Sequence, residues 1–398
     1  MPRREYGSGS VYFRKSDARW VGTIEAGWTR TGARRRITVT GKTEAEAKRK
    51  LRDKRAKIER EGVASASSRT TVKAWAETWL ADRATKDRPK TFVTDKGALD
   101  AWIVPTIGHK RLEQLTPADV RAVSNALREA GKKPATMKRY HGVLMRMLKA
   151  AVQEGVNIPP RVLVVDPPAA NAHDRQAIPI PDVLALMREA QALPHRSRWA
   201  MALLQGMRQG ECLGLTWDAV DLEAGRVEIS WQLQSLPYLD KTDRSKGFRL
   251  PDDAEVRHLE KSWHLVRPKT SAGWRMIPLI PEMRTALEEW RKVAPTSPYG
   301  LVWPRANGGP LSIRTDTAEW EALQKAAGVK HPAGRWYHVH EARNTTATIL
   351  LELEVPESVR IAIMGHSNIV VTRGYETVAQ KQMLEALTRA GGVLKLGM

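Results

Sequence analysis

The sequence predicts a multidomain α+β protein, with a small three-stranded β domain carrying one helix, then an all-helical domain, then a mixed, mainly α-helical domain with a small antiparallel sheet. A chain of 398 residues is too long for one ordinary hydrophobic core. Period-two alternation occurs near the N-terminus, whereas most other segments follow helical spacing. A small, polar linker at 63–70 and a proline-rich one at 156–181 separate these regions. We therefore expect domains at 1–62, 70–156 and 175–398.

Composition excludes several classes of protein. Hydrophobic residues make up 42% of the chain, but no apolar run approaches the ~18 residues of a membrane span. The first ten residues contain no apolar signal core, so we expect a cytoplasmic protein with no membrane partner. The single cysteine, Cys212, cannot form an internal disulfide or a cysteine metal cage, and we expect it to be a small buried residue.

The positive charge is concentrated at the N-terminus. The net charge is +21, and residues 1–60 hold 18 Lys/Arg against 7 Asp/Glu, or +11. About half of the excess therefore lies in the first seventh of the chain. This asymmetry favours a dedicated nucleic-acid-binding segment over a general contribution to solubility.

The N-terminal 62 residues read as three strands and a helix. The expected strands are Ser10–Arg14, Arg19–Glu25 and Arg35–Thr40. A Thr-x-x-Glu capping box at Thr43 opens a basic helix that runs to about Arg60. The alternative is a disordered basic tail, but the alternation of Ile37 and Val39 with polar neighbours argues against it.

Four short helices are expected in the middle domain. They begin near residues 72, 91, 117 and 134, and the last ends near residue 155. Thr116 is an N-cap followed by proline at the first helical position, and Gly131 ends that helix.

The C-terminal domain should contain helices at 181–192, 197–205 and 314–327, and a strand at 226–232. We expect residues 266–279 to fold as a hairpin that turns at 270–273. Residues 233–262, named here the insertion, are polar and charged, and the sequence gives them no function. The tail 380–398 has helical apolar spacing, which suits packing on a neighbouring subunit or closure of its own domain.

The stretch from His340 to Tyr375 carries the chemistry. His340 and Arg343 are three residues apart, so on a helix they share a face. His366 follows Gly365 at an expected helix end. No Ser or Cys stands beside a base, and no metal cage is apparent. Cations, hydrogen-bond donors and a phenol instead suit attack on a phosphodiester.

These residues resemble the C-terminal active-site boxes of the tyrosine recombinases, the phage-integrase family. Residues 206–217 are similar to the first arginine box of that family, and residues 267–279 to its β-hairpin lysine segment. The resemblance covers residues from about 70 to 395, and the ordered set of boxes is what makes it specific. The resemblance implies a DNA breaking-rejoining fold for the catalytic domain, a SAM-like core-binding domain before it, and an arm-type DNA-binding domain at residues 1–62.

The resemblance also assigns six site residues: Arg208, Lys269, His340, Arg343, His366 and Tyr375. Tyr375 would be the nucleophile that forms a phosphotyrosine. Arg208 and Arg343 would hold the non-bridging oxygens of the transition state, because guanidiniums keep their charge. Arg208 lies in otherwise apolar sequence, where a charge needs a partner or ligand.

The remaining roles concern protons and orientation. Lys269 would protonate the leaving oxygen, and Lys261 is a weaker rival outside the box. His340 would assist proton removal or hold the phosphate, and His366 would donate a hydrogen bond to it. Glu211, three residues after Arg208, either orients that arginine or forms an ordinary helix ion pair. Glu341 and Asn344 depart from the His-x-Leu-Arg-His form common in the family, which affects tuning rather than activity.

The expected partners are double-stranded DNA attachment sites of core and arm type, bound by a homotetramer that exchanges strands through a Holliday junction. An accessory DNA-bending protein and an excision factor are possible further partners. No metal cluster or P-loop is visible, so we expect neither cofactor nor ATP. The expected function is integration and excision of a mobile element such as a prophage in a bacterial cytoplasm, at the nucleoid. The alternatives are a type IB topoisomerase and an inactive DNA-binding regulator.

Overall fold

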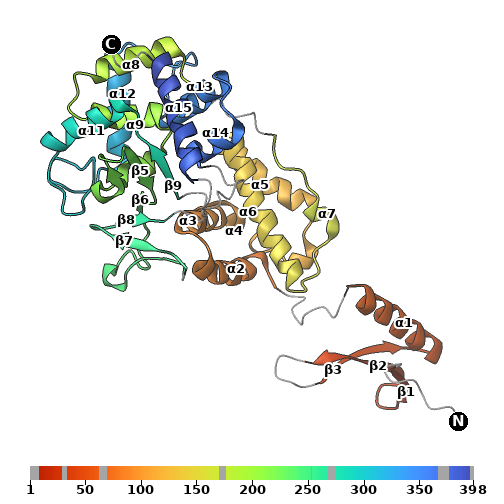
Figure 1. Cartoon of the computed structure of the whole chain (residues 1–398). Helices are drawn as coiled ribbons and strands as arrows, with labels where there is room; N and C mark the ends of the chain where they lie inside the picture. Colours follow the sequence, from red (N-terminus) through yellow and green to blue (C-terminus); the bar gives the residue numbers. More distant parts are fainter. Residues whose placement is uncertain are drawn as a thin grey trace. The chain divides into compact units, whose positions relative to one another are not determined.

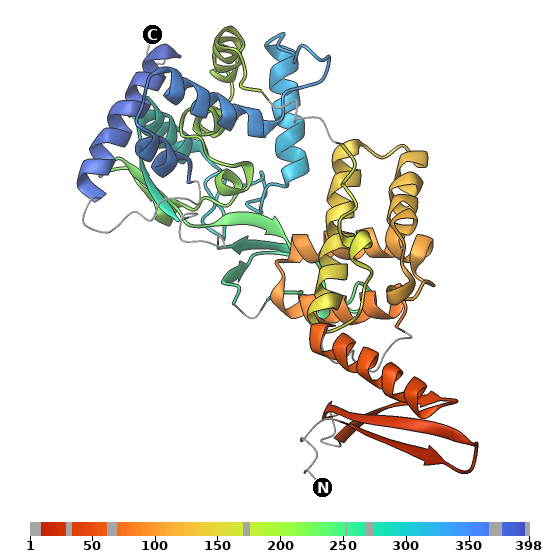
Figure 2. The same ribbon diagram turned by 90° about the vertical axis from the view of Figure 1, so that its right-hand side faces the viewer.

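The computed structural model describes residues 9–28, 34–61, 70–169, 176–251, 253–267, 274–365 and 376–394 (Figures 1 and 2). The chain forms two compact units, Met1–Asn171 and Ala172–Met398. Helices dominate, and the strands form three small antiparallel sheets, which confirms the predicted α+β class. Within the described residues, no helix is long and apolar enough to cross a membrane.

The N-terminal sheet confirms the predicted strands almost residue for residue. It has the order β1-β2-β3, formed by β1 (Ser10–Arg14), β2 (Arg19–Trp28) and β3 (Arg34–Gly41). Helix α1 (Glu44–Glu61) packs on this sheet, and its Ala47 and Leu51 are buried, as are Val21 and Ile24 of β2. The hydroxyl of Thr43 accepts from the Glu46 N–H at 3.2 Å, as the capping box predicts.

A helical core follows the linker. Its elements are α2 (Val72–Lys86), α3 (Pro89–Ala98), the π-helical segment Leu99–Ile103, α4 (Val104–Ile107), a 3-10 turn (Leu112–Gln114), α5 (Pro117–Glu129) and α6 (Pro134–Gln153). The second expected helix, predicted to begin near residue 91, starts at Pro89 and contains a wider, π-helical turn at Leu99–Ile103. Thr116 caps α5 as expected, and the structure adds a capping box with Asp119.

The proline-rich segment is only partly a linker. Pro160 opens a short helix, α7 (Pro160–Leu163), in which proline occupies the first turn, where its missing N–H costs nothing. Ile158 and Val162 are buried in the core of the helical domain. The prediction that residues 156–181 form a linker throughout is therefore wrong for its first part, which packs as core.

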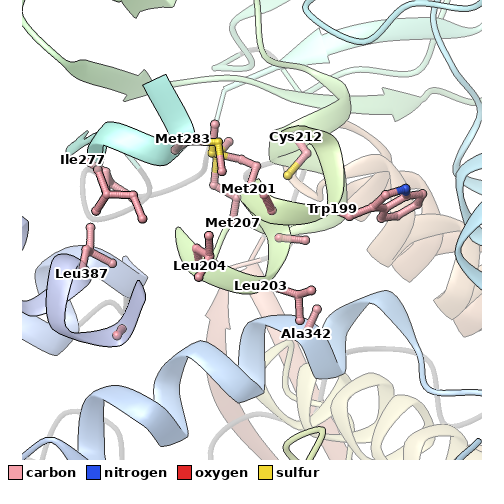
Figure 3. Packing of buried hydrophobic residues seen from close by; sticks show 14 of the residues in the cluster. Trp199, Met201, Leu203, Leu204, Met207, Cys212, Ile277, Met283, Ala342 and Leu387 are labelled. Atoms are coloured by element: carbon pink, nitrogen blue, oxygen red, sulfur yellow. The ribbon is translucent and has the colours of Figure 1, made fainter. Parts of the chain in front are cut away.

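The second unit is built around a central helix. Its helices are α8 (Ile180–Ala190), α9 (Arg196–Leu204), α10 (Gln209–Leu213), a 3-10 turn (Trp217–Ala219), α11 (Pro281–Val293), α12 (Ile313–Ala326), α13 (Val339–Glu352), α14 (Glu357–Met364) and α15 (Glu376–Val393). All residues of α9 from Ser197 to Leu204 are buried. In Figure 3, Leu203 lies beside Ala342 of α13, and Leu387 of α15 faces Ile277 of β9. Helix α15 thus closes its own domain.

Two sheets flank this core. One has the order β4-β5-β9, from β4 (Val220–Asp221), β5 (Arg226–Ile229) and β9 (Arg275–Pro278). The other has the order β6-β8-β7, from β6 (Gln232–Ser235), β7 (Val256–His258) and β8 (Trp263–Val266). The expected strand 226–232 is therefore interrupted after Ile229. The turn of the hairpin predicted at 266–279 lies outside the described residues. Its two described ends do not pair with each other, because β8 pairs with β6 and β7 while β9 pairs with β5.

Candidate active site

Arg208 stands at the start of α10, where the chain turns out of the buried helix α9. Gly206 makes that turn with a φ of +59°, a conformation that L side chains rarely adopt. A Cβ on Gly206 would also lie 2.7 Å from the sulfur of Met364, so glycine is required twice over. The turn leaves the Arg208 side chain partly exposed to solvent.

The buried carboxylate of Glu211 binds two arginines. Its Oε1 accepts from Arg208 Nη1 at 2.6 Å, and its Oε2 accepts from the Arg208 backbone N–H at 2.9 Å. Arg275 of β9 donates Nη1 and Nη2 to the same carboxylate, at 3.2 and 2.8 Å. Burial alone would raise the pKa of Glu211, but the charges of and hydrogen bonds from Arg275 and Arg208 lower it to about 2. Glu211 is therefore ionised at any physiological pH.

Arg343 lies one turn into α13 and is almost completely buried, with 2% of its surface exposed. Its two terminal nitrogens donate to the carbonyl oxygens of Gly206 and Met364. Burial, together with the neighbouring charges of Arg208 and Arg275, lowers the pKa of Arg343 to about 9. The guanidinium therefore stays charged at neutral pH, but it is held close to other cations.

Three arginines donate hydrogen bonds to the C-terminal end of α14, each to a successive backbone carbonyl oxygen. Arg275 Nε donates to Ile363 at 2.9 Å, Arg343 donates to Met364, and Arg208 Nη2 donates to Gly365 at 3.2 Å. Gly365 ends the helix in the left-handed conformation, with a φ of +63°. Three guanidiniums against the one carboxylate of Glu211 leave this cluster with a net charge of +2.

Arg275 is a residue of this cluster that the sequence analysis did not identify. It opens β9 and shares the buried face of that strand with Ile277. The sequence offered one indication of this role: Arg275 is two residues from Ile277, so on a strand both side chains lie on the same face. If that face is buried, the arginine requires partners for its charge. Its partners, Glu211 and Ile363, are 64 and 88 residues away in sequence, and no local pattern indicates them.

The other predicted site residues are placed in part. His340 is exposed in the first turn of α13, three residues before Arg343, as their spacing predicts. His366 follows Gly365 directly in sequence, but His366, Lys269 and Tyr375 lie outside the described residues. Of the two candidate lysines, only Lys261 is described, and it stands in the tight turn between β7 and β8 with a φ of +52°.

Glu341, which departs from the common family form, has a structural position of its own. It is fully buried and accepts from both terminal nitrogens of Arg335 at 2.8 Å and from the His338 backbone N–H at 2.6 Å. It also accepts from the Gln176 backbone N–H at 3.3 Å. Burial would raise the pKa of Glu341, but these contacts lower it. The carboxylate therefore caps α13 and fixes the first turn, which carries His340.

The described part of the chain offers no group of three or more His, Cys, Asp or Glu side chains that could hold a metal ion. Cys212 is buried in the core beside the cluster, and burial raises the pKa of its thiol to about 12, so it is not a nucleophile at neutral pH. The chemistry available at the described site is therefore the binding of an anion by fixed cations.

Comparison with known proteins places this geometry in context. Residues 179–382 match the family model described as "Phage integrase family". Residues 71–128 match the model described as "Phage integrase, N-terminal SAM-like domain". An integrase of Saccharopolyspora erythraea is 25% identical over 418 aligned residues, covering 94% of this chain and 93% of that one.

Solved structures share the fold. A Tn1549 transposon integrase in complex with a circular intermediate DNA superposes with a TM-score of 0.63 at 16% identity, covering 79% of this chain and 99% of that one. A lambda integrase tetramer bound to a Holliday junction superposes with a TM-score of 0.56 at 16% identity, covering 96% of this chain and 97% of that one. At such identities the likeness establishes the architecture alone.

Proposed function

Because this chain belongs to the phage integrase family and is therefore a site-specific DNA recombinase of the tyrosine class, we propose that it integrates and excises a mobile element by way of a 3′-phosphotyrosine at Tyr375. A prophage is the kind of element we expect. The observation that carries this proposal is the arginine cluster, whose surplus charge of +2 is fixed in place by Glu211 and by the end of α14.

A phosphodiester fits this surplus charge. During attack on phosphorus, negative charge collects on the two non-bridging oxygens, and fixed donors stabilise that charge without reorganising. Arg208 is partly exposed whereas Arg275 and Arg343 are buried, so it is the described guanidinium best placed to meet a phosphate oxygen. Arg343 would add a second positive charge behind Arg208, and Arg275 holds Glu211 in place.

The proposed reaction balances without a cofactor. The Tyr375 oxygen forms a bond to phosphorus as the bond from phosphorus to the 5′-oxygen breaks, and His340 assists removal of the phenol proton. Lys269 donates a proton to the departing 5′-oxygen, and His366 donates a hydrogen bond to the phosphate. The covalent intermediate conserves the bond energy, so a second 5′-hydroxyl can reverse the step and join a new partner strand.

DNA is the partner of the whole chain, and we propose how its parts divide that task. Residues 1–62 would bind arm-type sites, residues 70–156 would clamp the core site, and residues 175–398 would carry out the chemistry. Four copies would hold two sites and exchange strands through a Holliday junction, which the lambda integrase tetramer of similar fold supports. An accessory DNA-bending protein and an excision factor would control direction.

Substitution of Tyr375 by Phe tests the proposal. We expect Tyr375→Phe to keep DNA affinity but to abolish the SDS-stable adduct on a nicked suicide substrate, because the variant lacks the attacking oxygen. Tyr337→Phe is the matched control: the Tyr337 hydroxyl donates to Asp182 at 3.3 Å, so this variant also loses a phenol oxygen in the same unit but should still form the adduct. An adduct with Tyr375→Phe would refute the assignment.

A second readout separates the rival functions. The wild-type chain should join two DNA molecules that carry its attachment sites. Relaxation of plasmids with a single site, without joining, would instead indicate a topoisomerase. Site-specific binding without any adduct would indicate a regulator.

A further inference from the structure

Arg198 and Asp316 form a fully buried ion pair that the proposed reaction does not use. Arg198 lies on α9 and Asp316 in the first turn of α12, and their exposed fractions are 1% and 0%. Arg198 donates Nε to Oδ1 of Asp316 at 2.9 Å and Nη2 to Oδ2 at 2.8 Å, so the contact is bidentate. The pair joins two helices of the catalytic unit that lie 118 residues apart in sequence at this contact.

Stability alone does not account for this pair. Moving two charged groups from water into a protein core costs about as much free energy as their attraction returns, and an apolar pair of similar volume is often at least as stable. The surroundings would suit apolar side chains, because the Arg198 guanidinium lies 4.8 Å from the centroid of the Trp199 ring, which packs on buried Trp320. What an apolar pair cannot provide is a hydrogen-bond acceptor.

The Asp316 carboxylate accepts from a second side chain, that of Gln209. Gln209 Nε2 donates to Oδ2 at 2.8 Å, the same oxygen that Arg198 Nη2 reaches. This amide nitrogen also lies 3.3 Å from the carbonyl oxygen of Ile313 and 3.1 Å from the hydroxyl oxygen of Thr317, whose own proton goes to Ile313. All three groups accept, so the nitrogen of the Gln209 amide, rather than its oxygen, faces α12.

Gln209 directly follows Arg208, and the two side chains attach to different helices. Arg208 Nη2 donates to the carbonyl oxygen of Gly365 at the end of α14 at 3.2 Å, whereas Gln209 binds α12. Arg208 is the N-cap of α10, and Gln209 is the first of its five residues. So short a helix is not stable by itself, so the orientation of its start depends on attachments of this kind.

The turn that carries Arg208 is therefore attached to two neighbouring elements. Glu211 attaches it to β9, because its carboxylate binds both Arg208 and Arg275. Gln209 attaches it to α12 through Asp316. The first attachment is part of the arginine cluster, whereas the second lies outside the cluster and is fixed in place by the buried ion pair.

We infer that Gln209, Asp316 and Arg198 are positioning residues that hold Arg208 in the orientation in which it meets the scissile phosphate. This inference rests on the proposed function, because it takes Arg208 as a ligand of that phosphate. The three residues act through Arg208 and need no contact with the reacting atoms. A displacement of about 1 Å at a reacting centre can lower a rate about 10²-fold, so loss of the attachment should reduce the rate of cleavage.

Gln209→Met in the full chain tests the attachment directly, because it removes the amide and keeps the length of the side chain. We expect it to slow single-turnover cleavage of a nicked suicide substrate by about 10-fold or more, with DNA affinity unchanged. Gln234→Met is the matched control, since it makes the same change at a partly buried glutamine of β6, and it should cleave at the wild-type rate. A wild-type rate for Gln209→Met would overturn the inference.

A double variant separates positioning from stability. Arg198→Met/Asp316→Leu replaces the ion pair by apolar side chains of similar size, an exchange that often leaves a protein equally stable or makes it more stable. This variant should slow cleavage as much as Gln209→Met does, because Gln209 loses its acceptor. Addition of Gln209→Met should then cause little further loss, since both changes break the same attachment. Defects that multiply would overturn the inference.

A substrate with a methylphosphonate at the cleavage site tests whether Gln209 acts through Arg208, and it does not require the double variant. Its methyl group replaces one non-bridging oxygen, so less negative charge develops for Arg208 to stabilise. On one of its two diastereomers, the defect of Gln209→Met relative to wild type should shrink to about 3-fold or less. An equal defect on all substrates would overturn the inference.

Arg208→Ala separates this failure from failure of the proposed function. If Arg208 binds the phosphate, the defect of Arg208→Ala should also shrink on the methylphosphonate, because the lost guanidinium then has less charge to stabilise. An Arg208→Ala defect that stays the same on every substrate would refute the phosphate-binding role of Arg208 itself. A shrinking defect for Arg208→Ala but not for Gln209→Met would refute only the positioning role.

Discussion

Replacement of Glu211 by Gln should destabilise the catalytic unit at neutral pH and do so less in acid. Glu211 is 4% exposed and its carboxylate holds Arg208 and Arg275. The substitution keeps the shape of the side chain but removes the one negative charge beneath three guanidiniums. Those cations would then repel each other with only carbonyl oxygens between them.

The pKa of Glu211 gives the magnitude. A carboxyl whose pKa falls from 4.5 to about 2 on folding contributes about 3 kcal/mol to the free energy of unfolding at neutral pH. Removal of one partner from a buried ion pair costs about 3–5 kcal/mol in other proteins, which agrees. Because the pKa is lowered on folding, the contribution is fully present above pH 4.5 and is lost as the pH falls toward 2. At pH 4 it should be smaller by about 1 kcal/mol.

Unfolding in urea can be monitored by hydrogen exchange of peptides from α9 and α13. This measurement would report the free energy of unfolding of the catalytic unit separately from that of the N-terminal domains. Glu289→Gln is the matched control, because it makes the same chemical change in an exposed ion pair with Arg196, and it should shift stability by less than about 0.5 kcal/mol. Equal midpoints for the two variants at pH 7, or a Glu211→Gln defect that is as large at pH 4 as at pH 7, would refute the reasoning.

Three further predictions address the site and the N-terminal segment. Arg343→Lys should lower single-turnover cleavage about 10²-fold, because an ammonium lacks the fork that reaches two carbonyl oxygens, and an unchanged rate would contradict the role. Gly206→Ala should lower the free energy of unfolding by about 1–3 kcal/mol more than Gly300→Ala, since both glycines have positive φ but only Gly206 would meet Met364. A chain that starts at Ser67 should still form the adduct on core-site DNA but lose integration between full sites. On DNA carrying the arm sequence, the slope of the logarithm of the binding constant against the logarithm of salt concentration should be shallower by about 0.9 per lost phosphate contact. An unchanged slope would leave residues 1–62 without a role in binding.

Local signals in the sequence predicted the elements well where a short motif determines them. Thr43 and Thr116 cap their helices through neighbours within a few residues, and strand β3 follows from the alternation of Ile37 and Val39 with polar neighbours. The spacing of His340 and Arg343 likewise depends on one helical turn, so their shared place on α13 could be predicted without knowing the fold.

Features that depend on distant partners could not be read in this way. The hairpin expected at 266–279 rested on local sequence, which carries no information about pairing: β8 pairs with β6 and β7, and β9 pairs with β5. The prolines near residue 160 suggested a linker, although Val162 is buried by residues far away in sequence. Arg275 was overlooked because its partners come together only in the folded chain. The roles of Lys269, His366 and Tyr375 remain predictions.

Helix α14 has an electrostatic consequence for the site on which it ends. The peptide dipoles of a helix place about half a negative charge at its C-terminus, which would repel an incoming phosphate. Here three guanidiniums donate to the carbonyl oxygens at that end of the helix. The partial negative charge is therefore neutralised inside the protein, and the same hydrogen bonds orient the arginines. The arginines are already oriented before any DNA arrives. The eight-residue helix α14 therefore arranges the cationic side chains of the anion site before the anion binds. Binding then requires little reorganisation of these side chains.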